Sequence, residues 1–177
     1  MNVFDESKKA QALIDTSPME AIEIYEGIWE AAPNEFDAWM CFFYLKALRK
    51  KLDYNSSIID AVVDKHKTNE LVRNLFGWWV FEKYVKKANR NEILKNEGIV
   101  LKMASITAQK DLSQKQEFPC PRTIALFSLI DAHAENLYNA KKIEEILSLI
   151  KPEYLSPVSD KINTEKGEIE LASDFEK

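Results

Sequence analysis

Glycine and proline, the residues that mark turns and hairpins, are scarce in this sequence. The 177 residues include only four glycines and six prolines. That scarcity disfavours a β-sandwich or a β-barrel, because both folds need many tight turns. Alanine, leucine, glutamate and lysine, which favour helices, are abundant instead. The composition therefore predicts an all-α fold, with enough residues for one domain or a short helical array.

Cysteines and long apolar runs are also few. The two cysteines, Cys41 and Cys120, are far apart and unaccompanied, so we expect neither a disulfide framework nor a zinc site. Charged residues interrupt every apolar stretch well before the roughly 18 residues that a membrane span needs. The first ten residues lack the basic flank and apolar run of a signal peptide. We therefore expect a cytoplasmic protein without membrane contact.

Enzyme motifs are missing as well. The sequence has no GxSxG elbow, no CxxC pair and no Walker glycine loop. His133 lies two residues from Asp131 and from Glu135, and residues two apart on a helix do not share a face, so the three cannot converge on a metal ion. We expect His66 to be a solvated histidine at a helix end, and Cys120 to be a structural turn residue rather than a reactive thiol. The sequence predicts no enzyme, no cofactor and no metal site.

Helical periodicity runs through most of the chain. The clearest helix begins at Ser17 and Pro18, where Ser17 is the expected N-cap and Glu20 completes a capping box, and it stops at Pro33. Further helical patterns cover residues 4–14, 38–52, 57–67, 69–87, 91–109, 122–140 and 141–150. We predict about seven helices in antiparallel pairs within residues 1–151, followed by an acidic tail or partial helix at 152–177.

One helix junction has the spacing of a helical repeat. Ala21, Tyr25, Pro33 and Trp39 match, without a gap, the small residue, aromatic, proline and tryptophan of a tetratricopeptide repeat. The later helices do not keep a 34-residue register, and Phe43 stands where the repeat has a glycine. The chain thus resembles a degenerate tetratricopeptide-repeat protein. The resemblance implies stacked antiparallel helical hairpins, an α-solenoid, that binds a protein partner on a concave surface formed by the first helix of each pair.

A looser resemblance concerns residues 35–150. The segments DAWMCFFYLKALRKKLDY and GWWVFEKYVK are similar to the long helix and the tryptophan-rich helix of tetratricopeptide-repeat-like regions in large bacterial proteins of conflict systems. In those proteins the repeat region adjoins nuclease, OB-fold or other effector modules. The resemblance implies a scaffold or coupling role in a bacterial defence or conflict system.

The segment NLFGWWVFEKYVKK, residues 74–87, contains Trp78, Trp79, Phe81 and Tyr84 within seven positions. A helix that is apolar on nearly all sides is buried in a multi-helix fold, and burying each ring is worth roughly 2–3 kcal/mol. We expect this helix to belong to the core, with at most one or two rings in an exposed groove.

The partner-binding surface is predicted from the repeat geometry. We expect protein contacts at six residues: Trp39, Phe43, Lys46, Arg49, Arg73 and Lys83. We also expect that reversing the charges of Lys46 and Arg49 together would weaken partner capture without lowering the melting temperature.

Two other partners stay open. Residues 38–110 carry 14 basic and seven acidic side chains, although the net charge of the chain is −5, so a nucleic acid could bind this basic middle segment. The same lysines are equally typical of solvated helix faces. Self-association is the other alternative, because terminal repeats without polar caps expose apolar surface.

Overall fold

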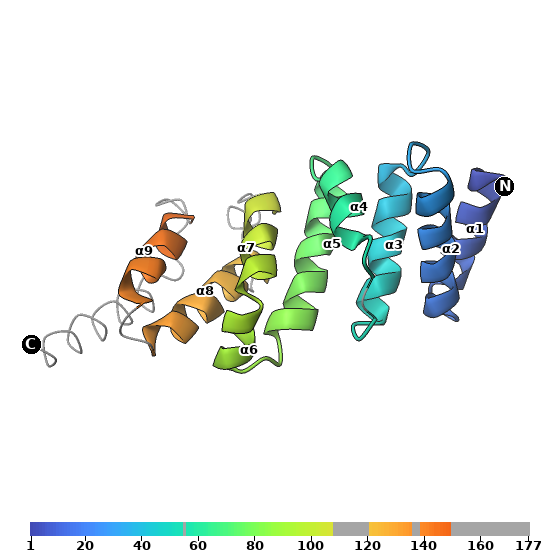
Figure 1. The fold of residues 1–177 in the computed structure, drawn as a ribbon. Coiled ribbons are helices and arrows are strands. Elements are labelled where there is room, and N and C mark those ends of the chain that lie inside the picture. The colour runs from blue at the N-terminus through green and yellow to red at the C-terminus, as the bar shows by residue number, and fades with distance from the viewer. Residues whose placement is uncertain (55, 108–120, 136–138, 150–177) are drawn as a thin grey trace, which may run out of the picture. The chain divides into compact units, whose positions relative to one another are not determined.

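The computed structural model describes residues 1–54, 56–107, 121–135 and 139–149. These residues form helices and turns and contain no strand (Figure 1). The predicted all-α fold is therefore confirmed. The chain divides into two compact units, Met1–Lys83 and Tyr84–Lys177. The expected tail at 152–177 and Cys120 lie outside the described residues.

The first unit is a row of helices in chain order. Its helices are α1 (Val3–Leu13), α2 (Pro18–Ala31), α3 (Ala38–Lys50), α4 (Ile59–Lys65) and α5 (Glu70–Val80), and a π-helical turn (Phe81–Val85) continues α5. Helix α2 packs between α1 and α3, and α3 packs against α5. The shorter α4 contacts α5. Helices α3 and α5 both begin at the end of the unit that is uppermost in Figure 1.

The core of the first unit is built around α2. Ala21 and Tyr25 are fully buried. The Tyr25 ring meets Phe36 and Tyr44 edge to face, with centroids 6.2 and 6.3 Å away, and its hydroxyl donates to the Ser7 carbonyl at 3.4 Å. Small and aromatic residues on α2 thus bring three helices into close contact.

A shared carboxylate connects α2 to the loop after α3. The hydroxyls of Tyr44 and Tyr54 each donate to Glu26, at 3.0 Å. The Tyr44 hydroxyl is also hydrogen-bonded to Ser56. The Tyr44 hydroxyl is protonated at neutral pH, as in any tyrosine, and burial raises its pKa further. The network fixes the loop against the core.

Helix starts are only partly as predicted. Asn69 caps α5 by accepting from the backbone N–H groups of Leu71 and Val72. The prediction of a capping box at Ser17 and Glu20 is wrong, because the Ser17 side chain makes no capping hydrogen bond. The backbone of Ser17 has ψ 65°, short of the extended conformation that aims a cap oxygen into the helix.

The second unit is organised around α8 (Pro121–Ala134). It packs against α6 (Arg90–Lys95), α7 (Glu97–Ile106) and α9 (Ala140–Ser148). The buried Arg122 donates to the carbonyls of Ala104 at 2.9 Å and Leu149 at 2.8 Å. Its guanidinium therefore joins the C-terminal ends of α7 and α9, where a cation is favourable.

The prediction of about seven helices is wrong, since the described residues contain nine α-helices. One reason is that the expected helix over 91–109 breaks at Asn96. This residue has φ −104° and ψ 17°, and its side-chain amide donates to the Glu92 carbonyl at 2.9 Å. Asparagine competes for backbone hydrogen bonds in this way and separates α6 from α7.

Within the described residues, no helix combines the length and the apolar character needed to cross a bilayer.

Candidate functional site

Helix α3 has one buried side and one aromatic side. Met40, Cys41, Tyr44, Leu45, Ala47 and Leu48 are buried. Trp39 is 60% exposed, and its ring stacks on Phe43 with centroids 5.5 Å apart and an interplanar angle of 28°. Phe42 meets Phe43 at 5.1 Å. The three rings at the start of α3 thus contact one another and are only partly buried.

Helix α5 carries a matching apolar row. Leu71, Leu75 and Trp78 follow at i, i+4 and i+7, so they share one side of the helix. Leu71 is 48% exposed and Trp78 is 39% exposed, whereas Trp79 is only 2% exposed. Helix α5 is therefore buried on the Trp79 side and exposed on the Trp78 side. The sequence analysis expected at most one or two exposed rings in this segment, and Trp78 is such a ring.

A salt bridge joins the two rows at their C-terminal ends. The guanidinium of Arg49 donates to both carboxylate oxygens of Glu82, at 2.8 and 3.1 Å, and it lies over the Trp78 ring at 5.2 Å. Bidentate geometry and ring stacking together orient the arginine. We call the surface formed by the two rows the aromatic face; it consists of Trp39, Phe42, Phe43, Leu71, Leu75 and Trp78.

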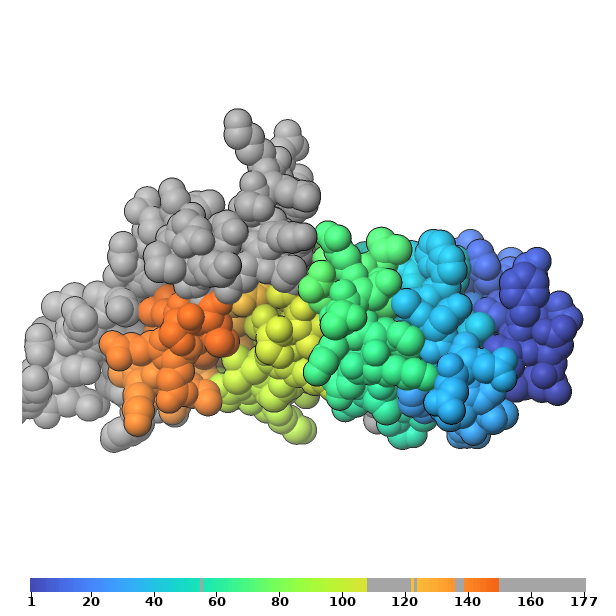
Figure 2. All heavy atoms as spheres, turned by 90° about the horizontal axis from the view of Figure 1, so that it is seen from above, coloured from blue at the N-terminus to red at the C-terminus, as the bar shows by residue number. Residues whose placement is uncertain are grey.

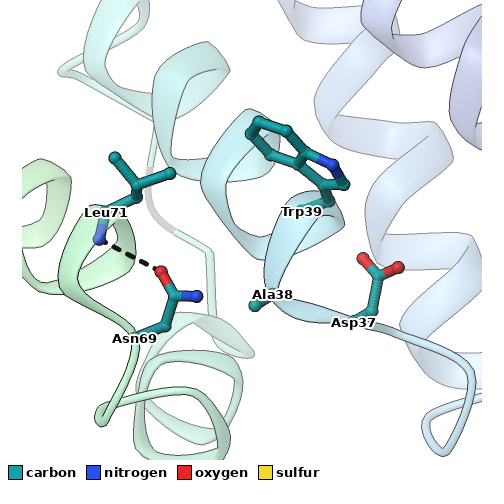
Figure 3. A pocket seen from close by; sticks show the side chains of 5 residues that line it. All are labelled: Asp37, Ala38, Trp39, Asn69 and Leu71. Atoms are coloured by element: carbon teal, nitrogen blue, oxygen red, sulfur yellow. Dashed lines mark hydrogen bonds between the residues drawn. The ribbon is translucent and has the colours of Figure 1, made fainter.

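A pocket of about 310 Å³ lies at the N-terminal end of the aromatic face. Leu71 and Asn69 line one side, and Trp39, Ala38 and Asp37 line the other (Figure 3). Asp37 accepts the Met40 N–H at 2.8 Å through Oδ1. Seen from this end of the helices, the side chains of the first unit form a continuous surface from α1 to α5 (Figure 2). The volume of the pocket is comparable to that of one or two amino-acid side chains.

Four of the six predicted contact residues come together on α3. Trp39 and Phe43 belong to the aromatic face, and Lys46 and Arg49 continue the same side of the helix. Lys46 is half-buried. The neighbouring Lys50 forms an ion pair with Asp15 and, with a smaller part from Lys46, holds the pKa of that carboxyl below its ordinary value.

The other two predicted residues lie elsewhere. Arg73 is two positions from Leu71 and from Leu75, so the helix places it on the opposite side of α5. Its Nε is buried and has no hydrogen-bond partner among the residues that the structure describes. Lys83 donates to the Tyr54 carbonyl at 3.3 Å and lies over the buried Trp79 ring at 5.1 Å. Burial lowers the pKa of Lys83.

The candidate chemical residues have structural partners. His66 is half-buried rather than solvated, so that prediction is wrong; its Nε2 is 2.7 Å from the Phe36 carbonyl oxygen. His133 is buried, with Nε2 3.1 Å from the Glu97 carboxylate. Burial raises the pKa of the Cys41 thiol to about 12. The described residues contain no group of three side chains placed to hold a metal ion.

Sequence reasoning missed the acidic partners of these groups. Glu82 lies 33 positions from Arg49, and Glu97 lies 36 positions from His133. No local spacing connects such pairs, so only the fold brings them together.

Comparisons with protein-family models, with curated proteins and with solved structures found no match to this chain.

Proposed function

We infer that this chain is a non-catalytic protein-binding module whose partner contacts the aromatic face. One observation carries the proposal. The large apolar side chains exposed in the helices of the first unit are Phe4 on α1, Trp39 on α3, and Leu71 and Trp78 on α5, whereas α2 and α4 expose none. Trp39, Leu71 and Trp78 belong to one face, and clustered exposed apolar and aromatic side chains are typical of a binding surface.

This alternation supports the resemblance to tetratricopeptide repeats. In that reading α1, α3 and α5 are the first helices of successive hairpins, and α2 and α4 are the second helices. The repeat places partner contacts on the first helices, which are the helices that carry exposed rings here. We propose a cytoplasmic scaffold of this α-solenoid type, with a role in a bacterial defence or conflict system.

Two features of the structure weigh against the alternative partners. Arg49 and Lys50, which belong to the basic cluster considered for nucleic acid, pair with Glu82 and Asp15, so less positive charge is left for phosphates. Helix α1 has acidic residues in its first turn, and only Val3 and Ala10 within it are buried. Apart from Phe4 and Ala12, the exposed side chains of α1 are polar, so this helix offers little apolar surface for self-association.

The role of Arg49 changes the design of the test. Because Arg49 binds Glu82 and covers Trp78, reversing its charge would set two carboxylates against each other and lower stability. The salt bridge therefore argues against the expectation that Lys46 and Arg49 can be reversed together without lowering the melting temperature. The test uses exposed apolar residues instead.

The experiment is affinity capture from extracts of cells that express the chain naturally, quantified by mass spectrometry. We compare the wild type with Trp39→Ser and Leu71→Ser. The matched control is Leu149→Ser, which removes an exposed leucine from the second unit. Proteins held by the wild type and the control should be lost from both face variants. Equal retention by all four chains would refute the proposal.

A further inference from the structure

The side chains along the aromatic face have the spacing of a helix surface. On α3, Trp39 and Phe43 lie at i and i+4, and the basic Lys46 follows at i+7; on α5, Leu71, Leu75 and Trp78 lie at i, i+4 and i+7. Successive side chains in such rows lie one helical turn apart, about 5.4 Å. An extended strand presents same-side residues about 6.6 Å apart. The rows therefore match a third helix more closely than a strand, since ridges of side chains fit grooves of the same period.

The two helices also run the same way, because both begin at the pocket end. Asp37 and Asn69 are their N-caps, and both line the pocket (Figure 3). The aromatic face thus has a defined direction, from the pocket to the Arg49–Glu82 bridge. A partner helix that lies along this face meets different groups at its two ends.

Charge differs between those two ends. The pocket end has the Asp37 carboxylate, of which Oδ1 caps α3. The other end has Lys46, which forms no ion pair within the described part of the chain, beside Lys50, which pairs with Asp15. Arg49 and Glu82 neutralise each other. The aromatic face is therefore flanked by a carboxylate where α3 begins and by an excess of one positive charge where α3 ends.

We propose that the aromatic face binds an amphipathic α-helix of a partner protein, antiparallel to α3. This helix has apolar residues at i, i+3 or i+4, and i+7. Its first turn carries acidic residues, which lie beside Lys46, and its last turn carries a basic residue, which lies beside Asp37. An apolar side chain near its C-terminal end fills the pocket between Trp39 and Leu71. Acidic first turns and basic last turns also suit the partner helix's own dipole. This inference rests on the proposed protein-binding function.

A displayed library of random peptides, roughly 15 residues or four helical turns long, tests the chemistry of the occupant. The library is selected on the purified wild-type chain after depletion on Trp39→Ser, and separately after depletion on Leu71→Ser. Melting curves first verify that both variants fold. Enriched peptides should share helical apolar spacing and an acidic-to-basic order from the N- to the C-terminus.

Other selection outcomes overturn the inference. Enriched peptides with alternating apolar residues would indicate an extended ligand. Peptides of the reverse charge order would contradict the antiparallel orientation. An absence of peptides that depend on Trp39 would refute the helix-binding inference, while loss of captured proteins from Trp39→Ser and Leu71→Ser would still uphold protein binding.

The orientation is then measured with one enriched peptide and a copy whose end charges are exchanged. Fluorescence anisotropy should show about two- to fivefold weaker binding of the exchanged copy, the effect expected of exposed charge pairs. Lys46→Glu should remove or reverse this preference. Equal binding of both peptides to the wild type would overturn the proposed orientation.

Discussion

The tryptophans of the first unit should differ in their contribution to stability according to how deeply each is buried. Trp79 is 2% exposed, Trp78 is 39% exposed and Trp39 is 60% exposed. A tryptophan side chain presents on the order of 200 Å² of surface, and its burial is worth about 25 cal/mol per Å². Alanine substitution should therefore cost roughly 5 kcal/mol at Trp79, roughly 3 kcal/mol at Trp78 and roughly 2 kcal/mol at Trp39.

Urea denaturation followed by tryptophan fluorescence measures these free energies in the relevant unit. All four tryptophans lie within Met1–Lys83, and each variant keeps three of them. Circular dichroism provides the control that every variant is folded in water. A loss of stability for Trp39→Ala as large as that for Trp79→Ala would refute the distinction between a core tryptophan and a surface tryptophan. An unchanged free energy of unfolding in Trp79→Ala would also refute this distinction.

Three further predictions concern alkaline pH, thiol reactivity and the salt bridge. Burial raises the pKa of Tyr25 to about 12. Tyr25 ionises near pH 10 in the unfolded chain but stays protonated in the folded chain, so it should cost up to about 1.4 kcal/mol of stability per pH unit between pH 10 and 12. Tyr25→Phe should remove this part of the slope in denaturant titrations. In a Cys120→Ser variant, the folded chain should resist iodoacetamide at pH 8 because the Cys41 thiolate is scarce, and rapid labelling without urea would contradict this. A double-mutant cycle of Arg49→Ala and Glu82→Ala should give a coupling of about 0.5–1 kcal/mol that decreases in salt; zero coupling would show that the bridge does not stabilise the fold.

Local sequence patterns predicted most of the helices and the bounds of α2. The Ala21 and Tyr25 spacing and the Pro33 stop depend only on neighbours in the chain, so periodicity was sufficient to find them. Residue type also showed that the segment around Trp78 and Trp79 belongs largely to the core. Which of the two rings is buried depends on the packing partners of α5, and the sequence does not contain that information locally.

Long-range electrostatic contacts account for most of what the sequence did not predict. In the sequence, Arg49 is one of several basic residues at a helix end, and only the fold places Glu82 beside it. In the same way, His133 and the carboxylate of Glu97 meet only because α7 and α8 pack together. The helix break at Asn96 has a local cause, because the asparagine side chain competes for a backbone hydrogen bond. The sequence did not reveal this break because the helical pattern of apolar residues continues on both sides of Asn96.

Photo-crosslinking inside cells that make the chain naturally tests the central claim most directly. A benzophenone amino acid replaces Trp39 on the aromatic face in one strain and the exposed Ala61 on α4 in another. If this face binds a protein, illumination should give a discrete adduct of a second protein from position 39 and none from position 61. Adducts of equal yield from both positions, or none from position 39, would contradict the account.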